Sequence, residues 1–313
     1  MKTLIDFDNA VVVAIPVRAG FGEPGRRECM LLEGPQGWGE FSPPPDIDDH
    51  LAARWLTAAV EPGTVGWPDA VRGRVPVAVE VPALDPEQAH QLVAAAGCRT
   101  AEVRVTGVGD TARVAAVRDA LGPRGRLRCV ADGTWDVETA AAAVAALARA
   151  AGDLEYVEQP CRTAEELATL RRNVDVRIAV RAVPGMSVGE VADVVVLECA
   201  SLGGVRRSLR IAETTGLPAV VRAGRQTSIG IAGAVALAGA LPELPFDCAV
   251  GRPSWVSADV ASTSRALVAA DGYVPVAPMP PAPESALLQE YAIDDADRLT
   301  WWRGRLARAR GAL

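Results

Sequence analysis

The sequence predicts an α/β barrel next to a smaller antiparallel domain. From about residue 74, short β-branched runs alternate with alanine-rich helical runs, giving about eight strands. Repeated βα units of this length are typical of a closed parallel barrel. Residues 194–197 (VVVL) are apolar throughout, as expected of a strand that is buried on both faces.

The first 73 residues predict the smaller domain. Strands are expected at 10–17, 29–33 and 37–41, with a glycine- and proline-rich loop at 20–27 and the turn GPQG before the third strand. A helix is expected at 46–59, because acidic residues lie in its first turn. We expect part of 270–313, including an amphipathic arginine-rich helix at 293–312, to join this domain.

Residues 74–269 are expected to form the barrel. Its predicted strands are 75–79, 101–105, 127–130, 155–157, 177–180, 194–199, 219–222 and 246–250. Its predicted helices are 86–96, 111–121, 137–150, 164–172, 205–215 and 229–240. Only a short segment, residues 182–193, follows the predicted strand 177–180 before the strand 194–199 begins. We therefore expect the helix of that unit to be shortened.

Composition excludes several classes of function. The net charge of −7 and the pI near 5.1 argue against binding to nucleic acid or to an anionic membrane surface. No apolar run is long enough to span a bilayer, and the N-terminus lacks the pattern of a signal peptide. The six cysteines are scattered without CxxC spacing, so we expect reduced core thiols and a cytoplasmic protein.

Charged residues stand at almost every predicted strand end. The carboxyl ends of barrel strands meet at one mouth, where active sites are built. These residues are Glu102, Arg104, Asp132, Glu158, Arg181, Glu198, Arg222, Arg225 and Arg252. One interpretation is a structural ring of ion pairs, since buried charges must pair. The other is a polar pocket with arginines for an anionic group and carboxylates for proton transfer.

Common general bases are nearly absent from this chain. Lys2 is the only lysine, and His50 and His90 are the only histidines, both in polar predicted helices. Proton transfer would therefore fall to carboxylates, whose pKa values rise when they are desolvated or lie near like charges. Glu198 comes directly after the apolar strand at 194–197, where an acid is costly to bury unless it is paired or used.

Five motifs carry a resemblance that covers nearly the whole chain. They are residues 38–42 (WGEFS), 133–136 (GTWD), 156–160 (YVEQP), 202–204 (LGG) and 227–230 (TSIG). With them the chain resembles the o-succinylbenzoate synthases of the enolase superfamily. The resemblance implies a modified (β/α)₇β TIM-type barrel under an α+β capping domain. It also implies proton abstraction next to a carboxylate, with Mg²⁺ holding the enediolate, followed by loss of water.

The metal-binding positions implied by the resemblance depart from the family pattern. One ligand is kept as Glu158, but the Asp expected on the third strand matches Val130, with Asp132 two residues on. The third ligand matches Arg181, which would repel the cation that it replaces. Mg²⁺ needs several hard oxygen ligands, so we expect no metal and no cofactor.

The catalytic lysines of the family are also replaced. The Lys-x-Lys pair matches Glu102 and Arg104, and the opposing lysine matches Glu198. The serine-rich end of the seventh strand matches Arg222 and Ala223. Arginine is almost always protonated and is a poor base. The replacements roughly keep the local charge balance, which favours a changed pocket over simple decay.

These observations favour a metal-independent, o-succinylbenzoate synthase-like enzyme, a lyase, isomerase or cyclase of specialised metabolism acting on a small, partly apolar, possibly anionic molecule. The expected catalytic residues are Glu198, Arg181, Glu158, Asp132 and Arg104. The expected substrate-binding residues are Glu102, Arg222, Arg225, Gln226, Arg252 and Phe21. The alternatives are a non-catalytic pseudoenzyme that binds a ligand or partner, and residual o-succinylbenzoate synthase activity. The substrate and the oligomeric state stay open.

Overall fold

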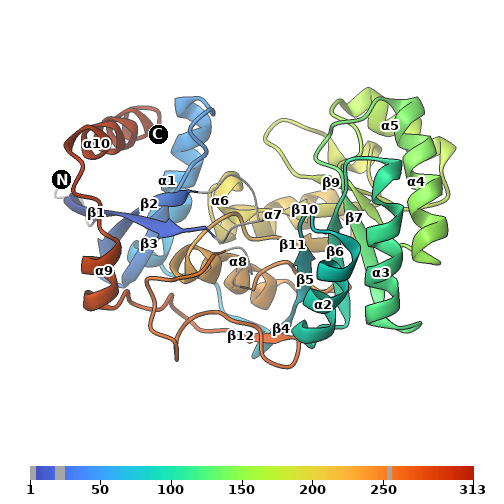
Figure 1. Cartoon of the computed structure of the whole chain (residues 1–313). Helices are drawn as coiled ribbons and strands as arrows, with labels where there is room; N and C mark the ends of the chain where they lie inside the picture. Colours follow the sequence, from blue (N-terminus) through green and yellow to red (C-terminus); the bar gives the residue numbers. More distant parts are fainter. Residues whose placement is uncertain (1–4, 18–24, 252–255) are drawn as a thin grey trace.

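The computed structural model describes residues 5–17, 25–251 and 256–313 and places an N-terminal capping domain beside a parallel barrel (Figure 1). The capping sheet is an antiparallel meander of β1 (Asp6–Pro16), β2 (Arg26–Gly34) and β3 (Gly37–Phe41). Helix α1 (Asp49–Thr64) packs on it. The three expected strands and the helix are therefore confirmed. The helix begins at Asp49 because the Asp48 side chain accepts the backbone N–H of Leu51 at 2.8 Å.

In the part of the chain that the structure describes, seven parallel strands form the barrel sheet in the order β11-β10-β9-β8-β7-β6-β5. Their bounds are β5 (Ala78–Val81), β6 (Thr100–Arg104), β7 (Arg126–Val130), β8 (Val157–Glu158), β9 (Ile178–Arg181), β10 (Val194–Leu197) and β11 (Ala219–Val221). The strand order follows the sequence order throughout. The carboxyl ends of all seven strands therefore lie at the same rim.

Two strand predictions need correction. The expected strand 75–79 is split at Val77: β4 (Arg74–Pro76) pairs with β12 (Tyr273–Pro275) in a separate sheet, and β5 enters the barrel. The expected eighth strand at 246–250 is reduced to two parallel bridges, from Cys248 to Val77 and from Ala249 to Arg222. These bridges lie at the first and last strands, so the segment still joins the two edges of the curled sheet.

Helices cover the outer face of the barrel (Figure 1). They are α2 (Pro86–Ala96), α3 (Thr111–Leu121), α4 (Val137–Ala151), α5 (Ala164–Asn173), α7 (Val205–Thr215) and α8 (Ser228–Ala240). Side chains at their N-termini explain several starts, as Asp85, Asp136 and Thr163 each accept a backbone N–H. Of the described residues, the short unit after Arg181 holds only the 3₁₀ turn η2 (Val188–Glu190), as expected. The predicted strand 194–199 ends earlier, because the one-turn helix α6 (Cys199–Leu202) begins at Cys199.

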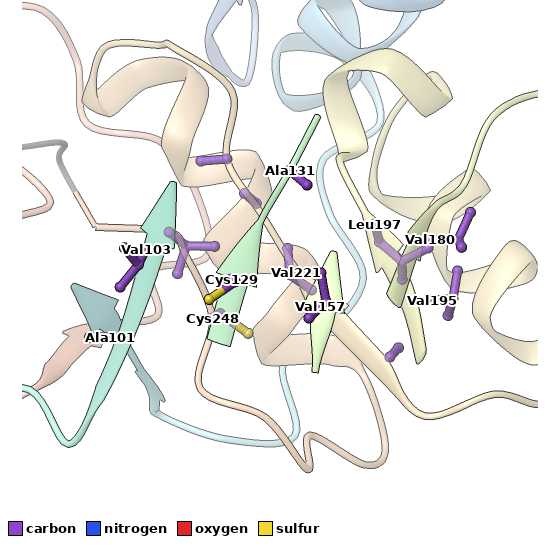
Figure 2. Close-up of a cluster of buried hydrophobic side chains, with 14 of the residues drawn as sticks. Ala101, Val103, Cys129, Ala131, Val157, Val180, Val195, Leu197, Val221 and Cys248 are labelled. Atoms are coloured by element: carbon purple, nitrogen blue, oxygen red, sulfur yellow. The ribbon is translucent and has the colours of Figure 1, made fainter. Parts of the chain in front are cut away.

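Side chains of the barrel strands alternate between the helices outside and the barrel interior. Val103, Cys129, Val157 and Val221 belong to the large cluster that packs against the helices (Figure 2). A smaller cluster holds the residues of opposite parity: Tyr156, Ala179, Val194, Val196, Val220 and Phe246. The period of two in a strand explains this division. It also sends the charged residues near the strand ends into the barrel.

The capping domain is completed by the C-terminal segment and is anchored to the barrel. Helices α9 (Ser285–Tyr291) and α10 (Ala296–Gly311) pack beside β1 and α1. The Glu61 carboxylate of α1 accepts the backbone N–H groups of Val205 and Arg206 at 2.6 and 3.1 Å, at the N-terminus of α7. Among the described helices, none has the length and apolarity needed to cross a bilayer. The domain boundaries at 73 and 269 stay a prediction.

Candidate active site at the barrel mouth

A cavity of about 750 Å³ lies between the capping domain and the carboxyl ends of the barrel strands. The capping domain contributes Arg27, Leu51 and Trp55 to its wall. The strand ends contribute a mixture of charged and apolar groups: Glu80, Val81, Glu102, Arg104, Val130, Arg181, Ala182, Glu198, Arg222 and Ala223. The expectation that charged strand ends converge on one mouth is met for these residues.

Arg222 lies at the centre of the charged groups. Its two terminal nitrogens donate to Glu102 Oε1 at 2.6 Å and to Glu158 Oε1 at 2.7 Å. Glu80 Oε1 lies 3.8 Å from the same guanidinium. The Arg222 side chain is only 12 % exposed, so these carboxylates compensate a cation that has largely lost its water.

Arg181 joins this group to a second set of ion pairs. Its Nε donates to Glu158 Oε1 at 2.6 Å, and a terminal nitrogen donates to Asp132 Oδ1 at 2.5 Å. Arg104 pairs with the other oxygen of Asp132. Arg181 therefore belongs to ion pairs of the kind expected for the strand ends, with Glu158 and Asp132 as its partners. Six of the predicted site residues form one continuous network.

The pairing leaves Glu158 ionised and out of reach of a substrate. Burial alone would raise the pKa of its carboxyl, but the guanidiniums of Arg222 and Arg181 lower that pKa to about 2. The side chain is 1 % exposed and does not line the cavity. A group in this state holds the arginines in place and is a poor proton carrier at neutral pH.

Glu198 differs from the other acidic groups at the mouth. It follows β10, and its carboxylate forms no hydrogen bond or ion pair with the residues that the structure describes. Burial raises its pKa, and the charges of Arg222 and Arg181 oppose that shift only in part. It lines the cavity. A partly desolvated, unpaired carboxylate beside a cavity is suited to taking or giving a proton.

Gly224 lies beside both the Glu198 carboxylate and the ring of Trp55. A Cβ atom at Gly224 would lie 2.6 Å from Glu198 Oε1 and 3.5 Å from Trp55 Cη2. Trp55 is buried and comes from α1 of the capping domain. An apolar ring near a carboxyl group disfavours its charged form, so the capping domain contributes to the environment of Glu198.

Four of the predicted substrate-binding residues are left, and the structure describes two of them, Arg225 and Gln226. Arg225 lines the cavity. Gln226 is buried near the junction with the capping domain, where its Nε2 lies 3.5 Å from Ser42 Oγ, and it does not line the cavity. Its contact with substrate stays a prediction. Phe21 and Arg252 lie outside the described residues.

The cavity-wall residues that sequence reasoning missed include Glu80, Arg27 and Trp55. Glu80 pairs with Glu102 in the barrel register and faces inward on the first strand; the period of two along 78–81 could have identified it. Burial raises the pKa of Glu80, and Arg222 opposes that shift. Arg27 and Trp55 belong to the capping domain, and nothing in the sequence alone places them over the barrel.

Comparison with known proteins identifies the family. Residues 85–283 match the family model described as "Enolase C-terminal domain-like", and residues 12–63 match "Enolase N-terminal domain-like". The o-succinylbenzoate synthase of Thermobifida fusca is 47% identical over 311 residues, covering 96% of this chain and 95% of that protein. The chain belongs to the enolase superfamily, among the o-succinylbenzoate synthase-like proteins. The resemblance found in the sequence is confirmed.

Two further similar proteins support this family assignment. The o-succinylbenzoate synthase of Mycolicibacterium smegmatis is 40% identical over 308 residues, covering 94% of this chain and 93% of that protein. In the fold, the muconate lactonizing enzyme of Pseudomonas putida aligns with a TM-score of 0.75 at 17% identity, covering 92% of this chain and 99% of that one. The expected modified TIM-type barrel with its capping domain is thereby confirmed.

The donor groups at this mouth do not fit the Mg²⁺ of the enolase-superfamily reaction. Mg²⁺ would need several carboxylate or water oxygens in octahedral geometry. Here Glu158 Oε1 accepts from two arginines, and both oxygens of Asp132 face guanidiniums. Among the described ranges, no group of three or more His, Cys, Asp or Glu side chains is arranged to hold a metal ion.

Proposed function

We propose that this enolase-superfamily protein is a metal-independent enzyme of the lyase or isomerase class, with Glu198 as its acid–base group. One observation carries the proposal. Glu198 is the carboxylate at the mouth that faces the cavity without a partner among the described residues, whereas Glu158, Asp132 and Glu102 are each held by arginines.

The arginines would supply the electrostatic part of the reaction. Removal of a proton from carbon next to a carboxylate builds negative charge on the carboxylate oxygens. Arg181 and Arg104 line the cavity, and their charges are fixed by Glu158 and Asp132. A fixed guanidinium can donate two hydrogen bonds to such a developing anion. Arg222 would act mainly by holding the carboxylates of Glu102 and Glu158 in position.

The cavity wall supports a small, anionic and partly apolar substrate. Among the described residues, its charged lining groups are Arg27, Arg104, Arg181, Arg222, Arg225, Glu80, Glu102 and Glu198. Pro44, Ile47, Leu51 and Trp55 give it an apolar side. The similar proteins are o-succinylbenzoate synthases. We therefore favour proton transfer at the carbon next to a carboxylate as the reaction type. The six free cysteines support the proposal of a reducing, cytoplasmic location.

Exchange of carbon-bound hydrogen in D₂O tests this proposal. The purified protein with excess EDTA is incubated with a panel of small carboxylates that carry a C–H bond next to the carboxylate, o-succinylbenzoate among them. We expect deuterium incorporation into at least one compound, detected by NMR, with no loss of rate on EDTA addition. We also expect no synthesis of o-succinylbenzoate, with or without Mg²⁺. Exchange that requires Mg²⁺, or synthase activity in the unmodified protein, would contradict the proposal.

Gly224 offers a second test that moves the Glu198 carboxylate without changing its chemistry. In Gly224→Ala, the new Cβ must displace the flexible Glu198 carboxylate from a 2.6 Å contact. We expect a turnover about 10- to 100-fold lower, because misplacement by about 1 Å has effects of that order. The free energy of unfolding should change by less than about 1 kcal/mol. Gly109→Ala is the matched control, since nothing lies within 4 Å of its Cβ.

The ion-pair network keeps the second candidate function open. Arg222, Arg181 and Arg104 bind most of the carboxylates at the mouth, which a non-catalytic protein would also need for stability. Such a pseudoenzyme would bind a ligand or partner in the cavity without turnover. Saturable binding of a panel compound with no deuterium exchange at any pH between about 5 and 9 would favour it.

A further inference from the structure

We propose that Arg27 of the capping domain is the anion-binding group of this cavity, and that it takes the carboxylate of a ligand with an apolar body. This inference rests on the proposed function for its use in a reaction, and it names the substrate class. Arg27 lies near the start of β2 and lines the cavity wall opposite the barrel strands.

The Arg27 guanidinium is held across the junction between the two domains. Its Nε donates to the backbone carbonyl of Arg225 at 3.0 Å, in the loop after β11. A terminal nitrogen donates to the carbonyl of Ser42 at 2.8 Å, directly after β3. A side chain fixed at two points loses little further freedom when it binds an anion.

Arg27 forms no ion pair with a carboxylate of the described residues, although its charge partly opposes the rise that burial causes in the pKa of the Glu40 carboxyl. Arg104, Arg181 and Arg222 each pair with at least one acid. No carboxylate of the described residues pairs with Arg27, and both of its hydrogen bonds go to neutral carbonyls. The guanidinium has more N–H groups than these two bonds use. A cation with spare donors at a cavity wall is a binding group for a carboxylate.

The cavity wall next to Arg27 indicates which class of anion would bind. Pro44, Ile47 and Leu51 lie on the same capping side of the cavity, with Trp55 nearer Gly224. These groups favour an apolar body over a small, fully hydrated ion. The charge of Arg27 acts on the Glu198 carboxylate across the cavity. A ligand anchored at Arg27 would therefore extend toward the proposed acid–base group.

Calorimetric titration tests the assignment with three probes: 2-naphthoate, its neutral analogue 2-naphthamide, and inorganic phosphate. The wild type is expected to bind 2-naphthoate at least about 10-fold more tightly than either other probe. In Arg27→Gln, affinity for 2-naphthoate should fall about 10- to 100-fold, the range for a lost charged hydrogen bond, while affinity for 2-naphthamide stays unchanged. Arg26→Gln is the control, because Arg26 is exposed on the neighbouring position of the strand.

Two results would overturn the assignment. One is 2-naphthoate binding to Arg27→Gln with wild-type affinity, and the other is tighter binding of phosphate than of 2-naphthoate by the wild type. Should Arg27→Gln fail to fold, a crystal of the wild type with 6-bromo-2-naphthoate decides, since the bromine locates the ligand. A carboxylate within hydrogen-bond distance of Arg27 supports the assignment, and any other position contradicts it.

The outcome is distinguishable from that of the proposed function. Arg27-dependent binding of 2-naphthoate without deuterium exchange on any panel compound would keep this inference and remove the enzyme. Exchange with a KM that Arg27→Gln leaves unchanged would keep the enzyme and remove this inference.

Discussion

Arg222→Ala is expected to lower the free energy of unfolding by about 3–5 kcal/mol, the cost of stranding one side of a buried ion pair. Arg222 compensates Glu102 and Glu158 at 2.6 and 2.7 Å and lies 3.8 Å from Glu80. Without it, these carboxylates would repel one another inside the barrel. The loss should be visible as a lower denaturation midpoint at pH 7 with an unchanged denaturant slope.

The pH dependence of the free energy of unfolding provides a second, independent test of this prediction. The pKa of Glu158 is lowered to about 2 from an ordinary value near 4.5, so its contribution to stability is present above pH 4.5. That contribution is lost as pH falls toward 2. Arg222→Ala removes part of the cause, so the difference between variant and wild type should shrink in acid. Arg124→Ala, at an exposed position, is the control. A loss below about 1 kcal/mol for Arg222→Ala would mean that the network is not a stabilising element.

The barrel was predictable because its signals are local. Apolar β-branched runs and alanine-rich helices recur with regular spacing, and α2, α3 and α7 have the bounds that were predicted. The errors fall where long-range pairing decides. Val77 ends one pairing and begins another, with β12 on one side and the barrel on the other. Nothing within residues 75–79 encodes that change of partner.

The candidate site was predictable in its composition but not in its pairing. Strand parity and strand ends sufficed to bring Glu102, Glu158, Arg181 and Arg222 together. Which oxygen each guanidinium reaches depends on the side-chain conformations and on the curl of the sheet, and neither can be read from the local sequence. The separation of Glu158, paired and covered, from Glu198, unpaired and facing the cavity, appears only in three dimensions. Arg27 required the placement of the capping domain.

The second large expected effect concerns Glu198, whose proposed role differs from that of the paired Glu158. Glu198→Gln is expected to lower any deuterium exchange or turnover by about 10²- to 10⁴-fold, the usual contribution of a general acid or base. The amide keeps the size of the side chain but cannot carry the proton. If Glu198 acts as the base, the wild-type rate should rise with pH through the raised pKa of its carboxyl. The residual rate of the variant should not follow that profile.

The same substitution should preserve or increase stability, which separates a functional role of Glu198 from a structural one. The folded-state pKa of Glu198 is raised, so the native state binds the proton more tightly than the unfolded chain. Ionisation therefore costs stability as pH rises from the unfolded value through the folded one. Glu198→Gln removes that cost, so at pH 8 the variant should unfold at a temperature equal to or above that of the wild type.

Glu190→Gln, at an exposed position, is the control and should change neither the exchange rate nor the unfolding temperature. A Glu198→Gln protein that is less stable and fully active would make Glu198 a structural residue, and proton transfer would pass to Glu80, the other cavity carboxylate with a raised pKa.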